Sequence, residues 1–236
     1  PGERPERLRQ HLTGAPWGIV TVCAVGLAVR LLFATVLVPH LERQANVASD
    51  PDRYAELAAS LIDRGELGFS APGVSPTSLR GPGFPAWLGA GMLVGGRSAR
   101  WVAFWASVPG LIAAVTIAIV LGRSHGRSAG LAGGLLCAAH PLACFVSARV
   151  LPDEFYAAAL FLGLVAWQSS LRSGRTLHLL GWAALAGLLL SAASLTRATA
   201  LCVLIVLVAT VVLIKPRHLL SCAVVVLVAA SLLGAW

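Results

Sequence analysis

The chain has 236 residues, of which 57% are hydrophobic and 12% are charged, and its formal net charge is +8 at pH 7. This composition excludes an ordinary soluble domain and is typical of a polytopic membrane protein. The positive charge does not indicate nucleic-acid binding, because the basic residues lie between apolar runs, where they orient membrane helices. The five cysteines all lie in apolar segments without metal-ligand spacing, so we interpret them as small packing residues.

The N-terminal part of the chain predicts a cytoplasmic tail and a first membrane helix. Residues 1–16 form the tail, which carries three arginines. Residues 17–39 are apolar and long enough to cross a hydrocarbon core of about 30 Å. A signal peptide is the rival interpretation, but the run is too long for one and is interrupted by Arg30. Because a charge at that depth is costly, we expect Arg30 to have a partner or to reach outward.

Residues 40–100 contain the only long polar segment, and we expect a functional site there, in an extracytoplasmic loop. Six of the ten acidic residues lie between Glu42 and Glu66. The other four acidic residues are Glu3, Glu6, Asp153 and Glu154. Ionisable residues that are concentrated in one part of a membrane protein indicate a site.

Two short juxtamembrane helices are predicted in this loop. Asp50 suits the N-cap of an amphipathic helix over residues 51–64, with a proline at its first position and Gly65 at its end. The residues at helical spacing that form its apolar face are Tyr54, Leu57, Ala58, Leu61 and Ile62. A segment rich in Gly, Ser and Pro follows over residues 68–83, and a second apolar helix begins near Pro85. We expect both helices to lie at the membrane surface.

The remainder of the chain, residues 101–236, predicts six further membrane helices. The expected spans are 101–122, 128–147, 154–171, 176–195, 198–214 and 218–236. The helix over residues 84–95 is too short to cross, and placing it at the surface puts every basic cluster between spans on the cytoplasmic side. These clusters are Arg123 with Arg127, Arg172 with Arg175, and Lys215 with Arg217. The prediction is an all-α polytopic membrane protein with about seven transmembrane helices, although Arg97 and Arg100 then lie outside, against the positive-inside rule.

Two motifs in the loop together resemble the first extracytoplasmic loop of GT-C glycosyltransferases. Asp50 begins a match to D-x-x-x-Y-A-E-[LI], and Arg80 begins a match to R-x-P-G-[YF]-P-x-[WF]-L. The most similar branch contains the protein O-mannosyltransferases and the lipid A aminoarabinose transferases. The family usually has two prolines after the arginine, whereas this chain has Gly81 and Pro82. GT-C enzymes are usually much longer, so the resemblance covers an N-terminal half.

The resemblance implies an inverting transferase that moves a sugar from a polyprenyl-phosphate donor to an extracytoplasmic protein, lipid or glycan. Asp50 would be the catalytic base, or would orient an acceptor that is already anionic, and Arg80 would bind the donor phosphate. The alternatives are a helix cap for Asp50 and a headgroup anchor for Arg80. Tyr54 and Glu56 are further substrate-binding candidates, although Tyr54 also suits packing or an interface anchor. The acids of that helix that are expected on its solvated face are Asp52, Glu56, Asp63 and Glu66, and of these Glu56 also belongs to the matching motif.

Three downstream residues are also candidates for substrate binding. The family often has an acidic residue at the position of Asp153 or Glu154, which would contact an acceptor or a metal, or would favour the helix dipole. Arg197 follows Leu-Thr, as in many family members, and suits either a lipid-phosphate contact or an interface anchor. His40 and His140 are weaker candidates as metal ligands, so a divalent metal is left open.

The expected location is the cell membrane, with the active site on the extracytoplasmic face. The expected partners are the polyprenyl-phosphate sugar donor, membrane lipids and the acceptor, and not nucleic acid. A transporter or flippase of lipid-linked sugars is the alternative, and it predicts broken helices in matching halves with acids near mid-membrane. A structural subunit of an envelope complex explains the hydrophobicity but not the clustered carboxylates. The acids of this chain gather at one face, which favours the enzyme.

Overall fold

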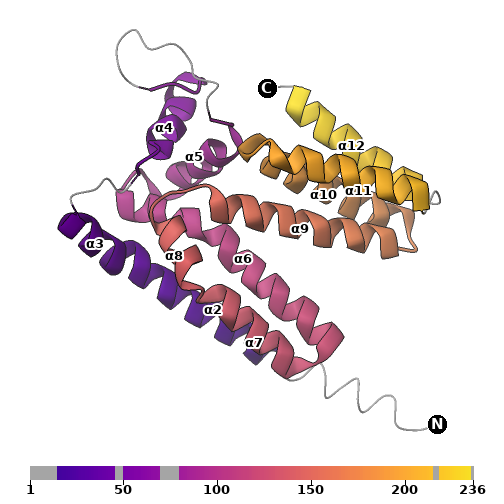
Figure 1. Ribbon diagram of the computed structural model, residues 1–236, viewed down its shortest axis with the longest axis horizontal. Helices are drawn as coiled ribbons and strands as arrows, with labels where there is room; N and C mark the ends of the chain where they lie inside the picture. The colour runs from indigo at the N-terminus through magenta and orange to yellow at the C-terminus, as the bar shows by residue number, and fades with distance from the viewer. Residues whose placement is uncertain (1–14, 46–49, 70–79, 215–217, 235–236) are drawn as a thin grey trace.

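The computed structural model describes residues 15–45, 50–69, 80–214 and 218–234, and this part of the chain consists of helices joined by turns and short connections, without strands. Figure 1 shows the helices in their order along the chain. They are α2 (Ala15–Leu32), the π-helical turn η1 (Phe33–Leu37), α3 (Val38–Ala45), α4 (Tyr54–Arg64), α5 (Gly83–Gly95), α6 (Ala99–His125), α7 (Arg127–Ala138), α8 (Pro141–Ala148), α9 (Asp153–Arg172), α10 (Thr176–Thr196), α11 (Thr199–Ile214) and α12 (Leu219–Gly234).

Four helices of the described part are long and apolar enough to cross a membrane, as a helical membrane protein requires. They are Trp17–Ala45, Ala99–His125, Arg127–Ala148 and Thr176–Thr196. The first runs further than the predicted end at residue 39, because η1 and α3 continue it into the polar segment. Helix α5 has 13 residues and so spans about 20 Å, too little to cross. The count of seven crossings stays a prediction.

The helices form two groups that meet at one end and diverge from there (Figure 1). One group contains α2, α6 and α7, and the other contains α9, α10 and α12. Helices α4 and α5 cover the end where α6 and α9 begin, and α8 leads into α9 there. We call this the acidic end. All eight acidic residues of the described part lie on α3, within residues 50–66 around α4, or at the start of α9.

The largest buried apolar cluster lies at the acidic end, beneath α4 and α5. It includes Tyr54, Leu57, Phe84, Leu88 and Phe155, which come from α4, α5 and α9. The predicted apolar face of the loop helix is therefore confirmed, since Tyr54 and Leu57 are buried. This packing fixes both short helices on the ends of α6 and α9.

A tryptophan ladder holds α5 against α6. The indoles of Trp87 and Trp105 stack at 4.9 Å, and each donates its Nε1–H to the other residue's backbone oxygen. Trp101 donates in the same way to the backbone oxygen of Gly91, at 2.7 Å. A side chain at Gly91 would overlap the ring of Trp105, so glycine is required for this close approach. The ladder sets the position of α5 and of the motif that begins at Arg80.

Helix α4 begins three residues later than the sequence predicted, and ends where predicted. Arg53 has φ 57° and therefore stands in the left-handed region, so the segment before Tyr54 is a turn rather than a first helical turn. At the other end Gly65 has φ 71° and closes the helix with its N–H on the carbonyl oxygen of Leu61.

Candidate functional site

Asp50 lies in the turn before α4 and binds the start of that helix with both carboxylate oxygens. Oδ1 accepts a hydrogen bond from the N–H of Tyr54 at 2.9 Å, and Oδ2 accepts one from the N–H of Ala55 at 2.7 Å. The N-cap residue of α4 is Arg53, so the predicted N-cap position of Asp50 is wrong, but the Asp50 carboxylate still caps the start of the helix from three residues earlier. Burial raises the pKa of the Asp50 carboxyl above its ordinary value, and hydrogen bonds from the backbone N–H groups of Ala55, Tyr54 and Arg53 offset part of this effect. A higher pKa makes the carboxylate a better proton acceptor near neutral pH.

Beside Asp50, an arginine, an aspartate and a tyrosine form what we call the first cluster: Arg80, Asp52 and Tyr54. Arg80 places one terminal nitrogen 2.6 Å from Oδ1 of Asp52 and its guanidinium 5.4 Å from the centre of the Tyr54 ring. Asp52 is thus an ion-pair partner and not only part of a solvated helix face, which corrects the sequence interpretation. The Arg80 side chain remains 38% exposed, so part of its guanidinium still faces outward.

A second cluster of the same composition is formed by Arg197, Asp153 and Tyr156, where α9 begins and α10 ends. Arg197 contacts Oδ1 of Asp153 at 2.5 Å, and its guanidinium lies 5.6 Å from the centre of the Tyr156 ring. The hydroxyl of Tyr156 is within 3.3 Å of the Thr199 hydroxyl. Both tyrosines of the chain therefore contact an arginine that pairs with an aspartate.

The start of α5 brings the two clusters together. A Cβ on Gly83 would lie 2.6 Å from the backbone oxygen of Ala192 and 2.6 Å from the hydroxyl of Thr196, so α5 begins directly against the last turn of α10. Phe84 packs edge-on to Tyr54 at 5.1 Å and contacts Phe155 at 5.7 Å.

Electrostatics also connects the two clusters through Tyr54. Burial raises the pKa of this tyrosine, and the charge of Arg80 lowers it in part. The charge of Arg197 lowers it further, so the arginine of the second cluster acts on the tyrosine of the first. The two arginines therefore contribute positive potential to one neighbourhood.

Gly81 explains where this chain departs from the usual motif with two prolines. A Cβ at this position would overlap the backbone carbonyl of Leu195. A proline ring does not fit there, so the approach of the Arg80 segment to α10 requires glycine.

Adjacent residues Asp153 and Glu154 point to different partners, and which of them takes part in function stays a prediction. Asp153 belongs to the second cluster, whereas Glu154 is buried and forms an ion pair with Arg30 of α2 at 2.6 Å. The expected partner of Arg30 is thereby confirmed. Gly110 of α6 makes room for this pair, because a Cβ there would overlap the Glu154 carboxylate.

Glu56, a candidate from the matching motif, forms a local pair outside both clusters. Its Oε2 contacts Arg53 at 2.5 Å, and the Arg53 guanidinium lies 4.4 Å from the centre of the Phe69 ring. Asp63, further along α4, pairs with Arg97 at 2.5 Å, and both side chains are about half exposed. These pairs fit the predicted solvated face of α4.

Backbone strain lies next to both clusters, a feature that the sequence did not reveal. Within the described residues, Arg53 and Val150 are the non-glycine residues with left-handed φ, at 57° and 56°. Such a conformation costs about 1–2 kcal/mol for an L-residue, and more for a β-branched one such as Val150. Strained residues persist only where the surroundings fix them, and they often lie at functional sites.

Neither histidine candidate joins a metal-binding group in the described chain. No group of three or more His, Cys, Asp or Glu side chains in the described part is arranged to hold a metal ion. His140 accepts a hydrogen bond from the N–H of Ala143 at 3.3 Å and caps α8. Its position is therefore explained by the helix that it starts.

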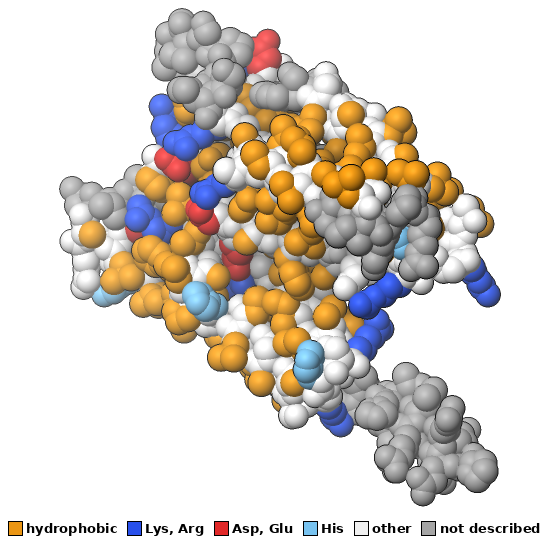
Figure 2. Space-filling model, turned by 45° about the vertical axis from the view of Figure 1, so that its right-hand side comes forward, with side chains coloured by type: hydrophobic (Ala, Val, Ile, Leu, Met, Phe, Trp, Pro, Cys, Tyr) orange, Lys and Arg blue, Asp and Glu red, His pale blue; other side chains and the backbone are white. Residues whose placement is uncertain are grey.

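Figure 2 shows the surface around these elements. Acidic and basic side chains alternate in one band, and many hydrophobic side chains lie on the described surface around it. Elsewhere in this view basic side chains lie without acidic neighbours. The alternating band is consistent with the partly exposed arginine–aspartate ion pairs at the acidic end.

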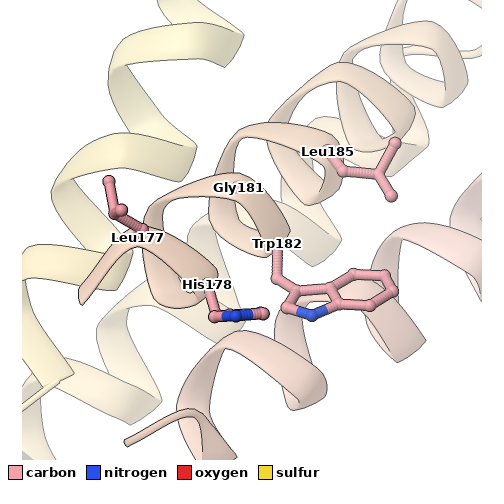
Figure 3. A pocket seen from close by; sticks show the side chains of 5 residues that line it. All are labelled: Leu177, His178, Gly181, Trp182 and Leu185. Carbon is pink, nitrogen blue, oxygen red and sulfur yellow. The ribbon is translucent and has the colours of Figure 1, made fainter. Parts of the chain in front are cut away.

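An open hollow of about 440 Å³ lies on the first half of α10, away from both clusters. It is lined by Leu177, His178, Gly181, Trp182 and Leu185. Figure 3 shows that the rings of His178 and Trp182 lie next to each other along one side of the helix. None of the predicted site residues lines this hollow.

No protein-family model, no curated protein and no solved structure matches this chain.

Proposed function

We propose that this chain belongs to an integral-membrane glycosyltransferase that transfers a sugar from a polyprenyl-phosphate donor to an extracytoplasmic acceptor. The observation that supports this most strongly is that Asp50 and the clusters of Arg80 and Arg197 lie at the same end of a helical membrane protein. A proton acceptor and two exposed guanidinium groups are the parts that such a transfer needs.

The depth of the site suits a lipid-linked donor. Helix α4 is amphipathic and α5 is short and apolar, so both suit a position at the membrane surface. A polyprenyl chain lies in the bilayer and therefore holds its phosphate at the same interface. The arginines of the first and second clusters would bind that phosphate at the interface, so the charged phosphate would not have to enter the hydrocarbon core.

In the proposed reaction Asp50 takes the proton from an acceptor hydroxyl. Its backbone hydrogen bonds from Tyr54, Ala55 and Arg53 occupy only part of the acceptor capacity of a carboxylate, which has about four lone-pair sites. The acceptor oxygen forms a bond to the anomeric carbon on the face opposite the phosphate, and the bond to the phosphate oxygen breaks. The electron pair stays on the polyprenyl phosphate, and inversion results.

Arg80 and Arg197 would bind the phosphate before transfer and stabilise its growing charge during transfer. Each guanidinium contacts its aspartate through a single oxygen in the pair distances above, and each is more than a third exposed. Arginine suits this role because its planar fork matches two phosphate oxygens at once.

The proposed topology has seven crossings, with the acidic end outside. The turns between α6 and α7 and between α9 and α10 lie at the far ends of those helices from α4 and α5 (Figure 1). They carry Arg123, Arg127, Arg172 and Arg175. Placing these turns in the cytoplasm satisfies the positive-inside rule and puts Asp50 on the opposite side.

The test is a transfer assay on the purified full-length protein in lipid nanodiscs, with a panel of polyprenyl-phosphate sugars. We expect one donor to release polyprenyl phosphate in step with sugar transfer. Saturable donor binding without release would favour a carrier of lipid-linked sugars instead. Neither binding nor release across the panel would contradict the proposed function.

A further inference from the structure

A fully buried ion pair lies between three helices just inside the acidic end. Arg30 of α2 meets Glu154 of α9 through both terminal nitrogens, at 2.8 Å and 2.6 Å, and the two side chains are 1% and 7% exposed. Gly110 of α6 faces the pair, and a Cβ there would lie 2.7 Å from Arg30 and would overlap Glu154. Three helices that are distant in sequence, α2, α6 and α9, therefore pack closely around this one ion pair.

Stability alone is a weak reason for such a pair. Removing two charges from water costs several kcal/mol for each ion, and apolar residues of similar volume often stabilise a core as well or better. One charge-assisted hydrogen bond and a second ion-pair contact do restrict the relative orientation of the elements that carry them, which apolar packing does less sharply. The orientation in question is that of the first turn of α9.

That first turn also presents Asp153 to the second cluster. Asp153 and Glu154 are consecutive, and they point to Arg197 and Arg30 respectively. The turn is entered through Val150, which has φ 56°, and Pro152, so its backbone has little freedom to rotate on its own. Any rotation of α9 that separates Glu154 from Arg30 therefore also moves Asp153 away from Arg197.

We propose that Arg30 and Glu154 are positioning residues for the candidate site. Their pair fixes the rotation of the first turn of α9 and thereby holds Arg197 at the donor phosphate through Asp153. Neither residue touches the substrate. The kinetic part of this inference rests on the proposed transferase function, whereas its structural part does not.

The decisive variant removes both charges together, as Arg30→Met with Glu154→Leu, so that no unpaired charge remains in the core. Because apolar replacement of a buried pair is often neutral or stabilising, we expect the melting temperature to be retained or raised. We expect kcat/KM for sugar transfer to fall by about ten- to a hundredfold, the scale of a catalytic group displaced by about 1 Å. Full kcat/KM with an intact melting temperature would overturn the proposal.

A second readout needs no activity. Hydrogen exchange of the full-length protein should become faster in the double variant at residues 153–157 and at residues 197–201, because both segments lose their fixed partner. Unchanged exchange at both segments would overturn the positioning role. If the wild type transfers no sugar, the proposed function fails, and the exchange result still decides this inference.

Two controls separate positioning from general damage. The exposed pair Asp63–Arg97 is the matched control, and Asp63→Asn with Arg97→Gln should leave both readouts unchanged. Adding the double variant to Asp153→Asn should lower kcat/KM little further, because the pair acts through Asp153. A full additional loss would show that the pair acts by another route and would contradict the proposal.

Discussion

The two ends of the helical bundle differ in how they use charge. At the acidic end each of Asp52, Asp153 and Glu154 contacts an arginine, and Asp50 binds the start of α4. The turns at the other end of α6 and α9 carry four arginines and no acidic residue in the described part. Unpaired arginines serve as topological signals, whereas paired and partly buried charges hold side chains in a fixed geometry. This difference is why we propose a site at the acidic end and a role in membrane orientation for the basic turns.

The largest expected effect is an all-or-none difference in labelling. Single cysteines at residues 70–78, which lie outside the described residues, should react with an impermeant thiol reagent added outside intact cells. Cysteines at residues 124–126 and 173–174 should not react until the membrane is opened. The unsubstituted chain, with its five native cysteines, gives the background. Outside labelling at residues 124–126 would mean that α5 crosses the membrane and that the two ends are assigned wrongly.

The next largest effect is expected from Asp50→Asn. Asn keeps one acceptor oxygen for the start of α4 but carries no charge and cannot take a proton. We expect the free energy of unfolding to stay near that of the wild type, because Asn caps a helix about as well as Asp, and sugar transfer to fall by about a hundredfold or more. Transfer kinetics and melting curves on the same preparation separate the two effects.

The matched control for Asp50 is Asp63→Asn, at the other end of α4. Asp63 is half exposed and pairs with Arg97, so its loss should leave transfer near that of the wild type. Asp52→Asn is not a suitable control, because Asp52 pairs with Arg80. If Asp50→Asn keeps most of its turnover, Asp50 is a helix cap and not the base.

A smaller effect is expected from Arg80→Lys. A lysine keeps the charge but not the planar fork, so donor binding should weaken by about tenfold, the scale of one lost charge-assisted hydrogen bond. Isothermal titration with a polyprenyl-phosphate sugar measures this change. Arg97→Lys is the matched control on an exposed pair, and equal donor affinity in Arg80→Lys and Arg97→Lys would reduce Arg80 to an interface anchor.

The pH dependence of transfer should report the environment of Asp50. A base must be ionised, so transfer should fall as pH drops through its pKa, and the acid limb should lie above the ordinary value of 3.8 because burial raises this pKa. The effect of pH on the free energy of unfolding runs in the opposite direction. Because the pKa is raised in the folded protein, protonated Asp50 stabilises the fold below pH 3.8, and this stabilisation is lost as pH rises through the raised pKa. An acid limb at or below 3.8 would remove Asp50 from this role.

Local sequence patterns predicted much of the acidic end. The helical spacing of Tyr54 and Leu57 identified the buried face of α4, and Gly65 marked its end. The cost of a charge inside an apolar run indicated that Arg30 needs a partner. These features depend on residues that are close in sequence or on the energetics of a single residue, so one sequence is enough.

The pairings between distant segments were not predictable in the same way. Nothing in the sequence assigns Glu154 to Arg30 and Asp153 to Arg197, because that choice depends on the rotation of α9 against α2 and α10. The pair of Asp52 with Arg80 was missed for the same reason, since α4 and α5 meet through tertiary packing. The start of α4 was misplaced because left-handed Arg53 has no local sequence signal.

The most direct test of whether the two clusters form one site is a double-mutant cycle on donor affinity. Kd for a polyprenyl-phosphate sugar is measured for the wild type, Arg80→Lys, Arg197→Lys and the double variant. The two single changes in binding free energy are added to give the Kd expected for independent sites. If both guanidinium groups bind the same phosphate, the measured Kd of the double variant should differ from that value, in either direction, by about threefold or more, a coupling of at least about 0.6 kcal/mol. Additive effects within error would contradict a shared site and would separate the clusters into two independent charged surfaces.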